Sequence, residues 1–204
     1  MRSFLVVAAL VLSAPSAFAG DPAAGKALYQ ICAACHGPEG QGNQAMNSPK
    51  LAGQADWYLT RQLKAFKDGL RGTAPGDMYG AQMRPMAAQL ADDAAIANVV
   101  AYIGTFTPAK PAATVTGNVE TGKGLYMTCA ACHGQKAEGN AQMNAPALAG
   151  QEDWYLVRQL QAYKKGLRGA NPQDVYGMQM KPMAGTLATD QAVNDVVAYI
   201  HSLN

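Results

Sequence analysis

The sequence predicts an all-α protein made of two tandem domains, each with about three main helices. Two observations carry this prediction. The chain repeats itself at a fixed offset of 97 residues, with 25–103 matching 122–200 without insertion or deletion, as expected of a duplicated domain. Within each copy the apolar residues recur at helical spacing, and no stretch sustains the alternation of apolar and polar residues that a half-buried strand would show.

The first 19 residues have the pattern of a cleaved signal peptide. Arg2 supplies a positive charge, residues 4–12 form a short apolar run, and Ala17-Phe18-Ala19 provides the small residues that a signal peptidase recognises. Because a membrane-spanning helix needs about 20 apolar residues, this run of nine is too short to serve as an anchor. We therefore expect cleavage after Ala19 and export to the periplasm.

The rest of the chain is expected to divide into residues 20–106, 107–116 and 117–204. The first and last segments are the two domains. The middle segment contains Pro108 and Pro111 among small residues, and this composition favours an extended linker over a packed element.

Three helices are expected in the first copy, with equivalents in the second. Asp21 followed by Pro22 is typical of a helix start, and this helix should run into Cys32. A second helix, stopped near Gly72, is predicted by four apolar residues at helical spacing, which are Leu59, Leu63, Phe66 and Leu70. A third, capped by Asp92, has its apolar face at Ile96, Val99, Val100 and Ile103. Three helices in so short a domain offer only a small apolar core. Such a domain needs additional stabilisation, which a large buried cofactor would supply.

The strongest motif is Cys-Ala-Ala-Cys-His, which occurs at 32–36 and again at 129–133. Two thiols three positions apart at a helix end can form thioethers with two vinyl groups on one porphyrin edge, while the adjacent imidazole reaches the iron. We therefore predict two covalent haem c groups. Their predicted thioether residues are Cys32, Cys35, Cys129 and Cys132, and their predicted iron-binding histidines are His36 and His133.

Three other uses of the motif are alternatives to haem attachment. A redox-active cysteine pair would be expected beside a strand in a βαβ unit, which the sequence does not indicate. A zinc site needs four ligands, whereas each copy offers two Cys and one His. The third alternative is a local disulfide. The two motifs use all four cysteines of the chain, so none remains for structural disulfides elsewhere.

The second iron ligand distinguishes an electron carrier from a catalyst. Each copy has a Met-x-Pro-Met-Ala segment before its last helix, and a thioether ligand would stabilise ferrous iron and raise the reduction potential. Two candidates compete in each copy, namely Met83 or Met86 and Met180 or Met183. The alternative is that all of these methionines only fill the core. A turn at the proline is expected to bring one sulfur back towards the iron.

These motifs together resemble the class I cytochromes c, and the dihaem cytochrome c4 family in particular, over nearly all of the mature chain. The resemblance rests on the Cys-x-x-Cys-His motifs, on Pro-x-Leu-x-Gly at 49–53 and 146–150, on Leu-Ala-Gly-Gln before an aromatic-rich helix, and on the late methionines. It implies that Met83 and Met180 are the iron ligands, because a small residue follows each of them after four positions and a leucine after seven.

The resemblance also implies supporting roles for residues around each haem. The carbonyls of Pro49 and Pro146 would accept a hydrogen bond from the ligand imidazole and fix its tautomer. Aromatic and arginine side chains would pack on the porphyrin edge or pair with its propionates, and these are Trp57, Arg61, Trp154 and Arg158. The alternative is that the aromatic residues are ordinary core and the arginines are solvated.

Charge narrows the choice of partners. The net charge of +2 is spread evenly, with 0 over residues 20–106 and +1 over 107–204. Without a basic patch, nucleic acid is not expected as a partner, and bulk charge gives no strong orientation towards any other protein.

The expected function is outer-sphere electron transfer by a dihaem carrier that is not an enzyme. The resemblance implies redox partners, with a quinol-oxidising complex as donor and a terminal oxidase as acceptor, and peripheral attachment to the membrane through such a complex. Three alternatives stay open: an electron-accepting subunit of a dehydrogenase, for example of sulfide or thiosulfate; a haem enzyme such as a dihaem peroxidase; and a non-redox module for metal or thiol exchange.

Overall fold

The computed structural model describes residues 20–204, so the expected signal peptide lies outside the described part. This part contains eight α-helices and no strand, apart from two isolated bridges that close loops. The first four helices are α1 (Pro22–His36), α2 (Asp56–Lys67), α3 (Met78–Ala88) and α4 (Asp93–Ile103). The second four are α5 (Val119–His133), α6 (Asp153–Lys164), α7 (Val175–Gly185) and α8 (Asp190–Ser202). The all-α, tandem prediction is confirmed.

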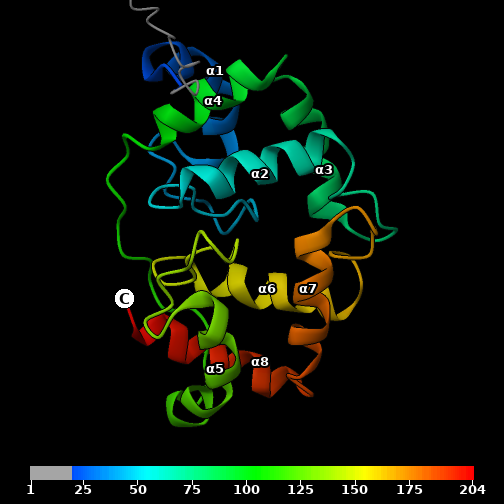
Figure 1. Ribbon diagram of the computed structural model, residues 1–204. Helices are drawn as coiled ribbons and strands as arrows, with labels where there is room; N and C mark the ends of the chain where they lie inside the picture. The colour runs from blue at the N-terminus through cyan, green and yellow to red at the C-terminus, as the bar shows by residue number, and fades with distance from the viewer. Residues whose placement is uncertain (1–19) are drawn as a thin grey trace, which may run out of the picture.

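Each domain is a small bundle with the same internal packing. Helix α1 packs against α4 and α2 against α3, and the second domain repeats this with α5 against α8 and α6 against α7. Figure 1 shows the two domains one above the other, with α2 and α6 next to the boundary between them and α3 and α7 on the same side of the molecule. The boundary is therefore formed by equivalent elements of the two copies.

Side-chain caps start the helices where the sequence indicated. The carboxylate of Asp21 accepts the backbone N–H of Ala23 at the start of α1, and Pro22 occupies the first helical position. Asp92 caps α4 in the same way through Ala95.

Helix α2 ends at Lys67 rather than continuing through Leu70 to Gly72, because the chain leaves the helix at Gly69, which has φ +74°.

Each domain has four helices rather than three, and α3 and α7 are the ones that the sequence did not predict. The Met-x-Pro-Met segments lie on these helices, so the turn expected at the proline is wrong. Asp77 starts α3 by accepting the N–H of Gly80. The helix was missed because its buried face consists of Gly80 and Ala87, whereas Met78 and Met86 are exposed. It therefore lacks the apolar stripe that identifies an amphipathic helix.

The predicted apolar face of the last helix is the centre of the core. Ile96, Val99, Val100 and Ile103 are all at most 4% exposed. Helix α1 crosses this helix at Gly25, where an added Cβ would lie 1.9 Å from the carbonyl oxygen of Asn98. Only glycine allows so close a contact between two helix backbones. This contact fixes the position of α1, and with it the Cys-x-x-Cys-His motif at its C-terminal end.

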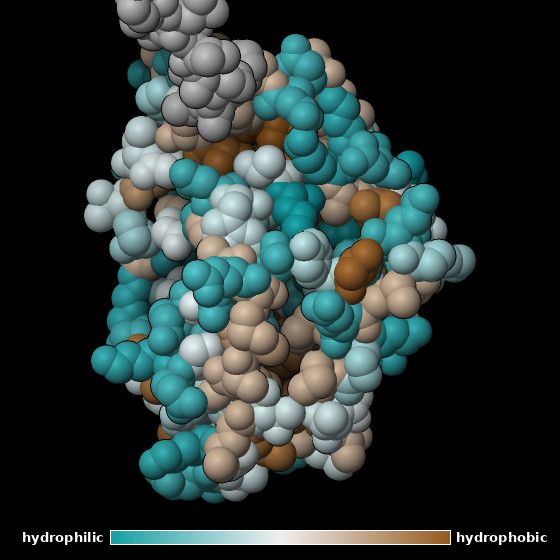
Figure 2. Space-filling model, in the orientation of Figure 1, coloured by the Kyte–Doolittle hydropathy of each residue, from teal (hydrophilic) through white to brown (hydrophobic). Residues whose placement is uncertain are grey.

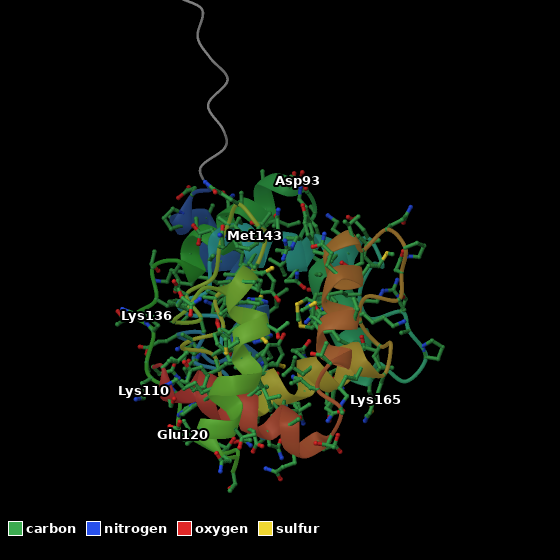
Figure 3. The ribbon with its side chains drawn as sticks, turned by 60° about the horizontal axis from the view of Figure 1, so that its bottom comes forward. Asp93, Lys110, Glu120, Lys136, Met143 and Lys165 are labelled. Carbon is green, nitrogen blue, oxygen red and sulfur yellow. The ribbon has the colours of Figure 1, made fainter. Side chains whose placement is uncertain are left out.

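The surface is chemically mixed. On the face shown in Figure 2, hydrophobic side chains appear in several separate places among hydrophilic ones. In Figure 3 the labelled charged residues lie at different points around the molecule, and these are Asp93, Lys110, Glu120, Lys136 and Lys165. Within residues 20–204 we find no helix that is both long enough and apolar enough to cross a bilayer.

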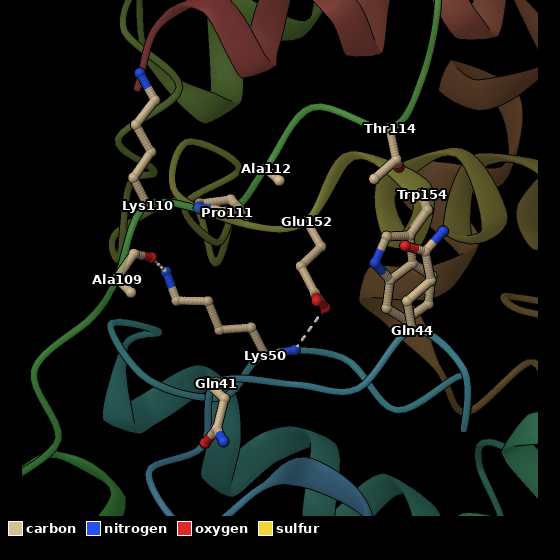
Figure 4. A pocket seen from close by; sticks show the side chains of 10 residues that line it. All are labelled: Gln41, Gln44, Lys50, Ala109, Lys110, Pro111, Ala112, Thr114, Glu152 and Trp154. Carbon is tan, nitrogen blue, oxygen red and sulfur yellow. Dashed lines mark hydrogen bonds between the residues drawn. The ribbon is translucent and has the colours of Figure 1, made fainter.

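Lys50 joins the two domains and the linker. Its side chain is 5% exposed, and its Nζ donates to the carbonyls of Ala109 at 2.5 Å and Gly150 at 2.8 Å. Its backbone N–H donates to Glu152 and its carbonyl accepts from Gln151, both in the second domain. Figure 4 shows the carboxylate of Glu152 bonded to the backbone N–H of Lys50, while the Lys50 side chain reaches the carbonyl of Ala109 in the linker. The contact between Lys50 and Glu152 has no counterpart in the repeat, because Ala147 stands at the position equivalent to Lys50 and Ala55 at the position equivalent to Glu152.

The linker is irregular, as its composition suggested, but it is bonded to the second domain. Asp153 is 1% exposed and accepts hydrogen bonds from both the N–H and the hydroxyl of Thr114 and from the N–H of Val115. It also accepts the N–H of Trp154. Burial alone would raise the pKa of this carboxyl, but the hydrogen bonds outweigh burial and hold the pKa below its usual value. The equivalent Asp56 is exposed.

We expect Asp153→Asn to lower the free energy of unfolding by about 1–3 kcal/mol at pH 7, because buried donors lose a charged acceptor. A carboxyl with a depressed folded-state pKa stabilises the protein above its unfolded-state pKa of about 3.9, and this stability is lost as pH falls through the folded-state pKa. Denaturant unfolding at pH 7 and below pH 4 should therefore show a difference that shrinks in acid. Asp56→Asn is the matched control, and an equal loss in that variant would contradict the argument.

Candidate functional site

The Cys-x-x-Cys-His motif occupies the last two turns of α1, and its copy occupies those of α5. Helix α1 ends at His36, because Gly37 has φ +83° and turns the chain away. All four cysteines are free thiols, so neither motif contains a local disulfide. Burial and the neighbouring Cys35 raise the pKa of Cys32 to about 11, and burial raises that of Cys129. Burial therefore disfavours the thiolate form of Cys32 and Cys129.

Both motif histidines are buried and held by a proline carbonyl. His36 is 6% exposed, and its Nδ1 lies 2.7 Å from the carbonyl oxygen of Pro49. His133 is 5% exposed, with Nδ1 2.8 Å from the carbonyl oxygen of Pro146. Because a carbonyl only accepts, Nδ1 carries the hydrogen and Nε2 keeps its lone pair. Burial lowers the pKa of both rings, although the bonds to proline act in the opposite direction. Each ring is therefore a neutral imidazole suited to binding a metal.

The loop after the motif places the proline carbonyl. Tight glycine turns return the chain after His36, and the N–H of Gly42 donates to the histidine carbonyl at 2.9 Å. The hydroxyl of Tyr29 donates to the carbonyl of Gly37 at 2.8 Å, one helix turn below the motif. Tyr126 repeats this bond in the second domain. Sequence reasoning overlooked these tyrosines, although each stands seven residues before its histidine in both copies.

Of the two methionines in each copy, one lies closer to the interior. Met83 is partly buried and shares a helix face with the buried residues Gly80 and Ala87. Met86 is 36% exposed. In the second domain Met180 is partly buried, whereas Met183 is 39% exposed. Helix periodicity therefore directs Met83 and Met180 inward, on the side of the helix that packs on the domain.

Arg61 contacts the other domain rather than solvent. Its Nη2 donates to the carbonyl of Asn144 at 3.0 Å, and its guanidinium lies 4.5 Å from the ring centre of Tyr176. Trp57 lies under the same guanidinium at 5.0 Å. The second domain makes the reciprocal contacts through Arg158 with Asn47, Tyr79 and Trp154. The Nε atoms of both arginines are buried without a hydrogen-bond partner among the described residues. The alternative that these arginines are simply solvated is therefore wrong.

Two further arginines at the domain boundary were not found from the sequence. Arg71 is 7% exposed and Arg168 is 6% exposed. Each follows its second helix in a Leu-Arg-Gly segment that recurs at the repeat offset. That repetition was the available signal, but an arginine in a loop is usually solvated. Only the packing of one domain on the other buries them.

The residues present fit a covalently attached haem. Two thiols at the end of one helix, a buried neutral imidazole with Nε2 unprotonated and an inward thioether form the donor set of a His/Met c-type site. The proline carbonyl supplies the outer hydrogen bond that orients a ligating histidine.

In the described part of the chain, no three His, Cys, Asp or Glu side chains gather into a group that could hold a metal ion.

Comparison with known proteins gives the same family for both halves. The family model "Cytochrome c" matches residues 22–107 and again 119–204. The chain is 34% identical to cytochrome c4 of Azotobacter vinelandii over 199 residues, which covers 91% of this chain and 90% of the relative. It is also 34% identical to a thiosulfate dehydrogenase electron acceptor of Thiomonas intermedia over 186 residues, 84% of this chain and 80% of that protein.

A solved structure agrees with this arrangement of two domains. Reduced recombinant cytochrome c4 from Pseudomonas stutzeri has a TM-score of 0.70 to this chain at 28% identity. The match covers 91% of this chain and 100% of that structure. Both halves of the chain are therefore covered by one cytochrome c4 structure.

We expect Tyr29→Phe to lower the free energy of unfolding by about 0.5–1.5 kcal/mol, because the carbonyl of Gly37 loses its buried hydrogen bond. Tyr102→Phe is the control, since Tyr102 stacks on Tyr29 in the same aromatic cluster. Denaturant unfolding of the mature protein measures both variants. Equal losses would show that the hydroxyl of Tyr29 has no special role in holding the loop.

Proposed function

Because the chain belongs to the cytochrome c family, in its dihaem cytochrome c4 group, we propose specific residues for the attachment and ligation of its two haem c groups. The proposed thioether residues are Cys32, Cys35, Cys129 and Cys132. The proposed iron ligands are His36 and Met83 in the first domain and His133 and Met180 in the second. The protein is a dihaem c-type electron carrier.

One observation carries the ligand proposal. Each motif histidine is buried, neutral and fixed through Nδ1 by a proline carbonyl. This leaves Nε2 as the ring atom available to iron, at the end of the helix that bears the thiols. Met83 and Met180 are supported as the opposite ligands because they lie on the inward face of α3 and α7.

The residues proposed around each haem bind and orient it, and they transfer no proton when the iron gains or loses an electron. When bound, each haem supplies an iron that accepts or donates one electron. His36 keeps the same tautomer in both oxidation states, because its hydrogen stays on Nδ1, which donates it to the carbonyl of Pro49. The ring of His36 is almost fully buried, so little of it is open to water. Rigid ligands on two helices favour transfer with little rearrangement, which suits a carrier with no substrate at the metal.

We propose that the carrier receives electrons from a quinol-oxidising complex and passes them to a terminal oxidase. Its likeness to cytochrome c4 over 91% of the chain supports this. The second candidate is an electron-accepting subunit of a dehydrogenase. The relative named as a thiosulfate dehydrogenase electron acceptor, at the same identity, favours that alternative. Methionine candidates in both domains support a carrier rather than a haem enzyme.

The proposed location is the periplasm, after removal of residues 1–19, with peripheral attachment to the membrane through a partner complex. The leader pattern ending at Ala19 supports export. The proposed units of the mature protein are residues 20–106 and 117–204, joined by 107–116. The four-helix packing of each unit supports these bounds.

We expect Met83→Ala to abolish the methionine-to-iron charge-transfer band of the first haem and to lower its potential, because a weak soft ligand is lost. Met86→Ala, three residues away on the exposed side, should leave the band intact. Optical spectra and a redox titration of the mature protein measure both variants, and a pyridine haemochrome assay should still report two haems. The reverse pattern would transfer the ligand role to Met86.

We expect the oxidised protein to be reduced at least tenfold faster by quinol with a quinol-oxidising complex than by thiosulfate with thiosulfate dehydrogenase. Stopped-flow absorbance of the haem bands gives both rates. Boiled enzyme is the control for direct chemical reduction. Faster reduction by the dehydrogenase would make the second candidate the physiological function.

A further inference from the structure

Two arginines and two glutamines form a closed ring across the domain boundary. Arg71 donates to Gln62 Oε1 at 2.5 Å and to Gln159 Oε1 at 3.3 Å. Arg168 donates to Gln159 Oε1 at 2.6 Å and to Gln62 Oε1 at 3.3 Å. Each amide oxygen therefore accepts from one arginine of its own domain and one of the other. We call these four residues the boundary ring.

The boundary ring holds two positive charges in a buried place. Both guanidinium groups are at least nine-tenths buried, and they stack on Phe66 at 4.3 Å and Tyr163 at 4.5 Å. Their hydrogen bonds within the ring go to neutral amides, and Arg168 also lies beside the hydroxyl of Tyr58. Both Nε atoms are buried without a partner among the described residues. Burying a charge without an opposite charge is costly. Two positive charges held in this place would favour an added negative charge nearby.

The boundary ring is connected by backbone contact to the proposed methionine ligands. Gly72 directly follows Arg71, and a Cβ on it would lie 2.3 Å from the carbonyl oxygen of Gly80. Gly80 is one helix turn before Met83. In the second domain Gly169 has the same contact, 2.1 Å, with the carbonyl oxygen of Gly177, one turn before Met180. The residue that follows each arginine therefore touches the helix that carries a proposed iron ligand.

We propose that the boundary ring is a shared cationic element that stabilises the reduced form of both haems, so that each arginine raises the potential of the haem in the opposite domain as well as its own. This inference rests on the proposed function. Reduction adds one electron from the redox donor to one iron, lowers the charge of that centre by one unit, and makes or breaks no bond. A fixed positive charge nearby favours the more negative, reduced state.

The shared character follows from geometry. Each guanidinium uses its two Nη groups on two different domains, so neither charge belongs to one haem site alone. Buried charges are also screened by salt much less than exposed ones. The effect of removing one arginine should therefore extend across the boundary and persist at high ionic strength.

The test is an optical redox titration of the full mature protein with both haems, with paramagnetic NMR of the haem methyl groups to assign each potential. We expect Arg71→Gln to lower both potentials, so that at the wild-type midpoint the ratio of reduced to oxidised haem falls about threefold or more at each site. Arg168→Gln should mirror this result. A fall only in the variant's own domain, or in neither, would overturn the proposal.

Two further variants keep the test decisive. Lys64→Gln removes an exposed positive charge that pairs with Asp93, and it should leave both potentials almost unchanged. Gln62→Glu keeps both arginines and the shape of the ring but adds a negative charge, so it should lower both potentials even if Arg71→Gln fails to fold. Unchanged potentials in Gln62→Glu would also overturn the proposal. Failure of the proposed ligation would appear separately, as a missing methionine-to-iron band in the unmodified protein.

Discussion

The hydrogen bond between each buried histidine and its proline carbonyl is the constraint on which the site depends. It fixes the tautomer of His36 and the orientation of its ring. The glycine turns that follow the motif and the hydroxyl of Tyr29 hold the loop that presents the carbonyl. The close crossing at Gly25 in turn fixes the helix that ends at the histidine. A small domain thus orients the proposed iron ligand with backbone groups, which do not titrate.

Duplication gives the molecule a near-symmetric boundary, and a few residues break that symmetry. Arg61 and Arg158 make reciprocal contacts, as do the members of the boundary ring. Lys50 and Asp153 do not have reciprocal partners, because alanine and an exposed aspartate stand at the equivalent positions. The reciprocal arginine contacts bring the two haem sites together. The contacts of Lys50 and Asp153, which are not reciprocal, bind the linker on one side. Two similar haem sites are therefore placed in different surroundings.

Local signals predicted much of the fold. The caps at Asp21 and Asp92 and the apolar face of α4 are local features, and the structure confirms them. Helix α3 was missed because its buried face is made of glycine and alanine, which give no apolar period. The end of α2 was placed too late because apolar spacing continues past the turn at Gly69. Small side chains explain the first error, since they pack closely without forming an apolar stripe, and a positive-φ glycine inside an apolar pattern explains the second.

By itself, the sequence determined the duplication, the helical class and the two Cys-x-x-Cys-His motifs, because covalent chemistry and helix periodicity depend on near neighbours in the chain. Family resemblance already favoured Met83 over Met86, and the structure places Met83 on the more buried side. Only the tertiary structure decided that Arg71 and Arg168 are buried together. Burial of a charge depends on which surfaces meet, and here the surfaces belong to domains whose arginines are 97 residues apart. No local pattern encodes such a distant contact.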